Sequence, residues 1–240
     1  MSDTTITVQG EHTERFAAER AVVISSVHTD GPLRESVFAR AVEASDALRN
    51  LIEGIHDAED GPILSWSSES VRVWSERPWN NEGKQLAPVF HSAVDFSATF
   101  VDFDALARWV EAAAAIDAVT IGSVSWDLTD ETRARVSSDV RTKAVEDAVA
   151  KATVYAAAIG LSAVRAVALA DPGMLGDPSA GNGGMPAPVF ARGALKSQAY
   201  DSGAPQLAFK PELIVVSGAV DGRFVASAPS SATKSKKSKK

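Results

Sequence analysis

A chain of 240 residues with 45% hydrophobic and 23% charged residues has the composition of an ordinary folded protein. A chain of this length buries roughly 70–75% of its unfolded surface, so its core needs no disulfide or metal for stability. The absence of cysteine excludes thiolate catalysis, disulfide bonds, iron–sulfur clusters and zinc sites with sulfur ligands.

The net charge of −7 conceals an asymmetry between the body and the C-terminal end of the chain. Five lysines lie within residues 234–240, and residues 1–233 carry 19 basic against 31 acidic residues, a net charge of −12. Because an acidic body repels phosphate backbones, no specific nucleic-acid partner is expected. We predict that residues 226–240 form a disordered Ser/Lys-rich tail, with recruitment to acidic polymers or anionic lipids as the alternative.

No segment has the pattern of an export signal or a membrane span. Met1–Gly10 is polar and acidic, whereas a secretory signal needs a basic start followed by an apolar run. The longest apolar stretches, such as Ala112–Ile116, are far shorter than the roughly 20 residues that cross a bilayer. These patterns predict a cytoplasmic protein without a transmembrane segment.

The first third of the chain alternates β-rich runs with turn residues. Ile6–Val8 and Arg20–Val27 are predicted strands, and Leu33 begins an amphipathic helix that ends near Gly54. Ile63–Trp74 alternates imperfectly and predicts one bulged or bent strand. Pro, Asn and Gly residues within 76–88 then predict a hairpin loop.

The middle of the chain predicts a strand, a helix and a second strand. Val89–Val101 has a period-two pattern, with Phe90, Phe96 and Phe100 on one face. Asp102 is placed to cap a helix over 103–116, and Val119–Leu128 follows as a strand.

The longest predicted helix runs from Thr129 or Asp130 to Ile159 and is rich in alanine. At 1.5 Å per residue it is a rod about 45 Å long, and Gly160 is placed to end it. Such a rod either follows a whole sheet or reaches a neighbouring molecule. Its predicted buried stripe comprises Val140, Ala144, Ala148, Ala152, Tyr155 and Ile159.

The last third of the chain contains two strands separated by a long loop. Val164–Ala170 is a short apolar strand, and residues 171–210 contain seven Gly and five Pro. Pro211–Val220, together with residues 223–225, returns to β character. We therefore predict one α+β domain over residues 1–225, with an antiparallel sheet and about three helices.

The order of these segments resembles the SIMPL-domain family across residues 4–225. The resemblance is carried by RAVVISSVHTDG, VRVW, VDFSATFVDFDALARWV, VTIGSVSWDLTDE, AVEDAVAKATVYAAAIGL and PELIVVSGAVDGRF, in that order. It implies an α+β fold and members that assemble into ring-like or channel-like homo-oligomers. It brings no enzyme chemistry and no cofactor, and it links the family to stress tolerance. Family members are commonly exported, whereas this sequence has no leader pattern.

The residues that usually perform catalysis or hold metals form no recognised motif. His12, His28, His56 and His91 are far apart and lack metal-ligand spacing. The glycine-rich segment 181–184 lacks the Lys-Ser/Thr of a phosphate loop, and the Ser-x-x-Lys of residues 231–234 falls in the tail. We predict no metal site, no cofactor and no enzymatic activity.

The densest group of aromatic and guanidinium side chains surrounds the predicted hairpin, and such residues are frequent in protein interfaces. We predict that this group is an oligomer interface, although Trp66 and Trp74 could equally fill the core. Trp109 and Trp126 are predicted core residues. The candidate interface consists of Trp66, Arg72, Trp74, Arg77 and Trp79.

Four functions are compatible with these patterns. The leading hypothesis is a non-enzymatic protein that associates with itself, and with an unidentified protein as a further possible partner. The second is a module that binds a small ligand or a peptide between its helices and sheet. The third is an enzyme whose acidic and histidine side chains converge only in three dimensions, and the fourth is tail-mediated binding of acidic polymers.

Overall fold

The structure is a computed structural model that describes residues 3–176 and 208–228. These ranges contain three helices and eight strands, which confirms the predicted α+β class. The single domain expected over 1–225 consists of two compact units. Unit 1 contains residues 3–16, 130–176 and 215–228 of the described chain, and unit 2 contains residues 17–129 and 208–214. No helix in the described ranges is both long enough and apolar enough to span a membrane.

Unit 2 contains an antiparallel five-stranded sheet in which the long central strands are β2 and β5. The strand order is β3-β5-β2-β6, and β4 pairs with the free half of β5 beyond β3. The strands are β2 (Arg20–Gly31), β3 (Ile63–Ser68), β4 (Arg72–Glu76), β5 (Val89–Phe100) and β6 (Val119–Asp127).

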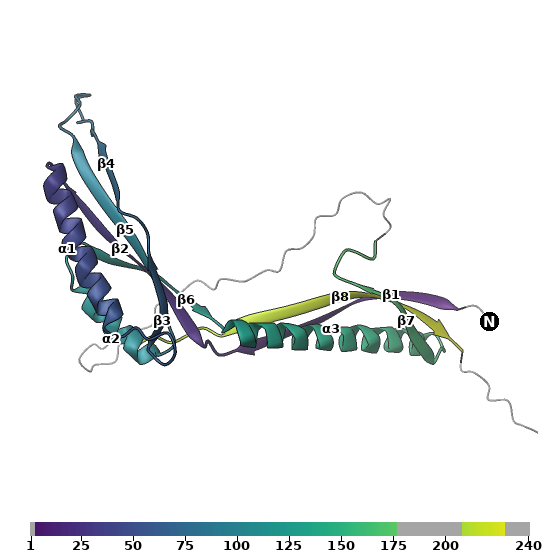
Figure 1. Ribbon diagram of the computed structural model, residues 1–240. Helices are drawn as coiled ribbons and strands as arrows, with labels where there is room; N and C mark the ends of the chain where they lie inside the picture. The colour runs from purple at the N-terminus through teal and green to yellow at the C-terminus, as the bar shows by residue number, and fades with distance from the viewer. Residues whose placement is uncertain (1–2, 177–207, 229–240) are drawn as a thin grey trace, which may run out of the picture. The chain divides into compact units, whose positions relative to one another are not determined.

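Helices α1 (Arg34–Glu53) and α2 (Phe103–Ala114) cover one face of this sheet (Figure 1). Odd-numbered residues of β2 and even-numbered residues of β5 point toward the helices, as the alternation in the sequence predicts. They form a core with the apolar stripe of α1 and with Trp109 of α2. The opposite face of the sheet carries no helix among the described residues.

Helix α2 begins as the sequence predicts. The Asp102 carboxylate accepts hydrogen bonds from the backbone N–H groups of Asp104 and Ala105, both at 2.9 Å. These bonds satisfy two N–H groups that have no partner inside the helix. The cap therefore fixes the start of α2 directly after β5.

The prediction of one bent strand over 63–74 is wrong, because this segment forms two strands. β3 pairs with the C-terminal half of β5 and β4 with its N-terminal half. Between them residues 69–71 leave the ladder, although the Glu69 N–H still donates to the Asp95 carbonyl at 2.8 Å. The sequence pattern shows β character throughout 63–74. It does not show that β3 and β4 pair with two different halves of β5.

Unit 1 is a three-stranded sheet with one long helix along one face (Figure 1). The strand order is β1-β8-β7, and helix α3 (Asp130–Ala158) packs mainly on β1. The strands are β1 (Thr4–Phe16), β7 (Ala163–Ala170) and β8 (Ile214–Ser227). β1 is longer than the predicted Ile6–Val8. Polar residues follow Val8, but exposed and less exposed positions continue to alternate along the strand as far as Phe16.

The buried residues of α3 recur at every fourth position, and most of them are alanine. They are Val136, Val140, Ala144, Ala148, Ala152 and Ala156. The predicted continuation of this stripe through Tyr155 and Ile159 is wrong, since these side chains are 55% and 57% exposed. Four residues advance slightly more than one turn, so the buried stripe winds slowly around the helix. Ala156 follows Ala152 on this stripe, and Tyr155 and Ile159 lie outside it.

Small residues allow α3 to lie directly against the sheet. A Cβ atom added to Gly10 of β1 would lie 2.0 Å from the Ala144 carbonyl oxygen. A Cβ at Gly218 of β8 would lie 3.1 Å from the Val140 carbonyl oxygen. The alanine stripe and these two glycines therefore set the separation between helix and sheet.

The end of α3 confirms the predicted glycine stop. Gly160 has φ of 77°, a left-handed conformation, and the Leu161 N–H donates to the Ala156 carbonyl at 2.9 Å. β7 follows at once, and β8 joins the two β-rich runs of the C-terminal region into one strand. Most of the loop predicted over 171–210, and most of the predicted tail, lie outside the described residues.

Candidate functional site

The predicted tryptophan and arginine cluster divides between the two faces of the unit 2 sheet. Trp66 of β3 faces the helices and packs against the core. Arg72 and Trp74 of β4 point to the helix-free face, where Arg72 forms a hydrogen-bonded ion pair with Asp95 of β5. Arg77 and Trp79 follow β4, and both are exposed. The structure therefore brings together Arg72 and Trp74 and separates them from Trp66.

Three rings meet on the helix-free face of unit 2. The Trp74 ring stacks on His91 with ring centroids 5.2 Å apart, and His28 lies 5.9 Å from His91 and 6.0 Å from Trp74. His91 is also 3.5 Å from the Glu76 carboxylate. Sequence reasoning missed this group because the strand register, not the spacing in the chain, places β2 and β4 on either side of β5.

The hairpin loop beyond β4 presents the most exposed tryptophan of the cluster. Trp79 is 66% exposed and forms an isolated bridge with Gln85. The Asn80 side chain holds the loop by accepting from the N–H groups of Glu82 and Lys84. Trp109 of α2, by contrast, is buried in the core as predicted, and Trp126 packs against the same core.

The histidines do not converge on a metal centre in the described ranges. No group of three or more His, Asp or Glu side chains there has the arrangement of a metal site. His12 lies in β1, 3.5 Å from Glu14, and His56 forms a backbone bridge with Ile63. Only His28 and His91 approach each other, within the ring group already described.

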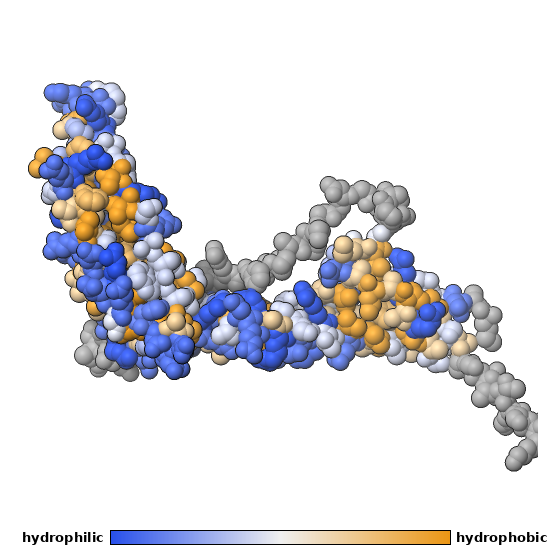
Figure 2. Space-filling view, viewed as in Figure 1, coloured by the Kyte–Doolittle hydropathy of each residue, from blue (hydrophilic) through white to orange (hydrophobic). Residues whose placement is uncertain are grey.

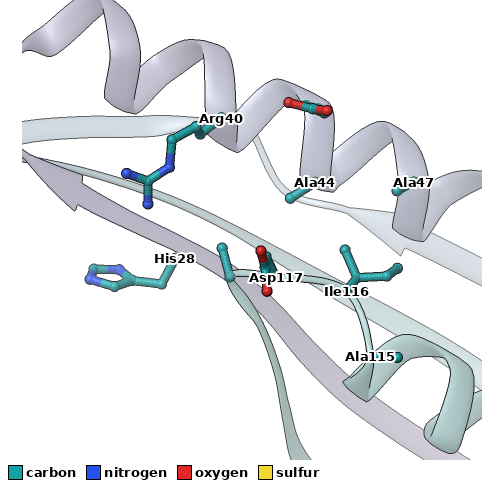
Figure 3. Close-up of a pocket in the computed structure, with 9 residues that line it drawn as sticks. His28, Arg40, Ala44, Ala47, Ala115, Ile116 and Asp117 are labelled. Carbon is teal, nitrogen blue, oxygen red and sulfur yellow. The ribbon is translucent and has the colours of Figure 1, made fainter.

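A groove with a volume of about 700 Å³ lies between α1 and the turn that joins α2 to β6 (Figure 3). It forms because β2 continues to Gly31, whereas its pairing with β6 ends at Val27 opposite Val119. The last paired contact is the His28 N–H, which donates to the Ala118 carbonyl at 2.8 Å. The lining residues are His28, Arg40, Glu43, Ala44, Ala47, Ala115, Ile116, Asp117 and Ala118.

The turn at the base of the groove has an uncommon backbone conformation. Ala118 has φ of 68°, in the left-handed region that residues with a Cβ rarely adopt. The Ala118 carbonyl accepts the hydrogen bond from the His28 N–H of β2. The N–H of the next residue, Val119, donates to the Ile116 carbonyl at 3.2 Å. These bonds fix the turn and with it the position of Asp117.

The two edges of the unit 1 sheet differ in their protection. At the β1 edge, Asp147 of α3 accepts a hydrogen bond from the Glu11 N–H, and Lys151 donates to the Gln9 carbonyl, both at 2.9 Å. Asp147 and Lys151 also form an ion pair at 2.8 Å. The hydrogen bond from Lys151, and then that from the Glu11 N–H, lowers the pKa of the Asp147 carboxyl. Side chains from the helix thus occupy backbone groups that another strand would otherwise bind.

No such arrangement is found at the β7 edge within the described residues. The sequence of β7, AVRAVALA, carries one charge, and Leu169 is 48% exposed. A register shift against β8 leaves Val167 out of the regular ladder, and it too is exposed. Figure 2 shows apolar residues gathered over β7 and the C-terminal part of α3. The exposed large apolar residues of these two elements include Val154, Val167 and Leu169.

The described residues form two sheet-and-helix units of α+β type, and no recognised catalytic motif occurs among them. The chain belongs to the SIMPL family, described as proteins of unknown function (DUF541), whose family model matches residues 6–224. This match confirms the resemblance identified from the sequence and includes most of the described residues of both units. A search among curated proteins finds no match to the chain.

Proposed function

We propose that the protein acts through self-assembly, as a homo-oligomer with a structural or stress-related role and without catalytic activity. The observation that carries this proposal is the contrast between the two edges of the unit 1 sheet. β1 is closed by Asp147 and Lys151, whereas β7 offers an apolar strand edge. An open apolar edge is a template for pairing with another chain, and natural proteins usually protect such edges.

The proposed contact is antiparallel pairing between β7 of one copy and β7 of a second copy. Such an interface is isologous, since the same strand contributes to both sides of a twofold axis. It would bury Leu169 and neighbouring apolar side chains and pair the outer backbone groups of the strand. This contact alone gives a dimer, and a ring-like or channel-like assembly requires a second one.

We assign the second contact to the hairpin of unit 2. Trp79 is a large rigid side chain at its loop, and exposed tryptophans are frequent centres of binding energy in protein interfaces. Leu86 of the same loop is also exposed. Trp74, Arg72 and Arg77 complete the surface that the sequence predicts as an interface, whereas Trp66 belongs to the core.

Single cysteines test the β7 contact, because the protein has none of its own. We expect single substitutions along β7, such as Ala166→Cys, Val167→Cys and Ala168→Cys, to yield disulfide-linked dimers under mild oxidation. The yield should peak at the residue nearest the twofold axis, since a disulfide needs Cα atoms roughly 4.4–6.8 Å apart.

Thr7→Cys is the matched control, because Thr7 is an exposed position on β1, whose edge is occupied by α3 side chains. We expect little cross-linking at this position. Equal cross-linking at β1 and β7, or none at any β7 position, would contradict the proposed contact.

A further inference from the structure

We propose that the groove of unit 2 is a binding site for a small zwitterion, a compound with one carboxylate and one ammonium group on a short aliphatic skeleton. This ligand site goes beyond self-assembly and involves none of the residues of the β7 contact. The groove has both signs of charge on its walls and small apolar residues between them.

Arg40 supplies the positive side of the groove. Its guanidinium makes one long contact, Nη1 to the Asp30 carbonyl at 3.4 Å, and forms no ion pair with a described residue. The other N–H donors remain available, and a guanidinium matches a carboxylate with two parallel hydrogen bonds. The Asp30 carbonyl belongs to the part of β2 beyond its pairing with β6, and Arg40 is one of the residues that line the groove.

Glu43 and Asp117 supply the negative side from opposite walls. Glu43 lies on α1 one turn from Arg40, and Asp117 lies in the fixed turn before Ala118, as Figure 3 shows for the latter. Neither carboxylate has a hydrogen bond or an ion pair with the described residues. The adjacent C-terminus of α2 has no basic side chain in its last turn, so its dipole adds to the preference for a cation.

The surface between the charges consists of methyl and short aliphatic groups. Ala44, Ala47, Ala115 and Ala118 leave the space that longer side chains would fill, and Ile116 is the largest apolar residue of the lining. A short aliphatic skeleton can contact these groups while its two charged ends reach Arg40 and the carboxylates. A simple cation would leave Arg40 unpaired, and a simple anion would leave both carboxylates unpaired.

The binding test uses the full-length protein and three zwitterions: L-leucine, L-alanine and 4-aminobutyrate. Isothermal titration calorimetry and backbone amide NMR shifts report affinity and location. We expect at least one of the three to bind with shifts confined to the groove. For leucine, leucinamide lacks the carboxylate and N-acetylleucine lacks the ammonium, and each should bind at least about tenfold more weakly because it loses a charge-assisted contact.

Three variants then connect binding to the residues of the groove. Arg40→Gln should reduce the affinity for the zwitterion by about tenfold or more. The double variant Glu43→Gln/Asp117→Asn should reduce it by a similar factor. Ala47→Leu should prevent binding because the larger side chain fills part of the groove, and it leaves the charge unchanged. Glu53→Gln, an exposed acidic position of α1 outside the groove, is the control and should leave affinity unchanged.

Circular dichroism and the thermal midpoint of each variant establish that the fold is retained. Absence of binding by all three zwitterions at millimolar concentration would overturn the proposal. For whichever zwitterion binds, equal affinity of the matching compound without the carboxylate, or unchanged affinity in Arg40→Gln, would overturn it as well. Loss of the β7 cross-links would leave these results unaffected, so the two proposals fail separately.

Discussion

At the scale of single residues, the packing of unit 1 depends on the absence of side chains. Gly10 lies directly beneath α3, where the strand meets the helix backbone between Ala144 and Ala148. A methyl group cannot fit at 2.0 Å from a carbonyl oxygen, so the helix must move away from β1 if one is added. Packed cores transmit such a shift to their neighbours.

We therefore expect Gly10→Ala to reduce the free energy of unfolding by about 3 kcal/mol, the upper end of the usual cost of overpacking. Gly218→Ala should cost about 1 kcal/mol, because its added atom meets the helix at 3.1 Å. Urea denaturation provides the measurement, and Gly176→Ala, whose nearest neighbour would be at 3.8 Å, is the control. Equal stability of the Gly10 and Gly176 variants would contradict this account of the packing.

At the scale of elements, β1 and α3 are joined by an ion pair as well as by apolar packing. The Lys143 ammonium donates to the Glu14 carboxylate at 2.6 Å. This hydrogen bond is the main reason that the pKa of Glu14 is lowered from its ordinary value of 4.5. Because both side chains are partly exposed, the stabilisation is screened by solvent and salt.

The lowered pKa gives a defined dependence of stability on pH. The unfolded chain binds a proton at Glu14 more readily than the folded chain, so the stabilisation is present above pH 4.5 and is lost as pH falls below it. We expect the stability difference between wild type and Glu14→Gln to shrink over this acidic range. Denaturation curves from neutral to acidic pH measure it, and a difference that grows on acidification would contradict the assignment. High salt should also reduce the difference at neutral pH.

The elements themselves were largely predictable, because their signals are local. The alternation of β5, the Asp102 cap and the Gly160 stop each depend on neighbouring residues, and all three agree with the structure. The division of 63–74 into two strands was not predictable in this way, since it depends on pairing with β5. The exposure of Tyr155 likewise depends on how α3 turns across its sheet.

The candidate sites were less predictable than the elements. The aromatic cluster around the hairpin was identified from composition, but only the strand register shows that Trp66 lies in the core and Trp74 on the opposite face. The groove depends on where the pairing of β2 with β6 ends, and the contrast between the β1 and β7 edges depends on strand order. These features come from contacts between residues far apart in the sequence, which periodicity does not encode.

At the scale of the whole molecule, the proposed self-assembly would use a different surface of each unit. Unit 1 contributes a sheet with one closed edge and one apolar edge, and unit 2 contributes the hairpin with exposed Trp79. Both surfaces are expected to be covered in an assembly, because large apolar side chains at an open edge otherwise favour nonspecific aggregation. A lysine on an edge strand is a common natural means of preventing such pairing.

Sedimentation equilibrium of the full chain tests the proposed self-assembly most directly. We expect a mass at micromolar concentration that is a multiple of the 25.2 kDa mass of one chain. The double variant Val167→Lys/Leu169→Lys should form a smaller assembly, and Thr7→Lys on β1 should leave the mass unchanged. A wild-type mass of 25.2 kDa throughout the micromolar range would show a monomer and would rule out the proposed self-assembly.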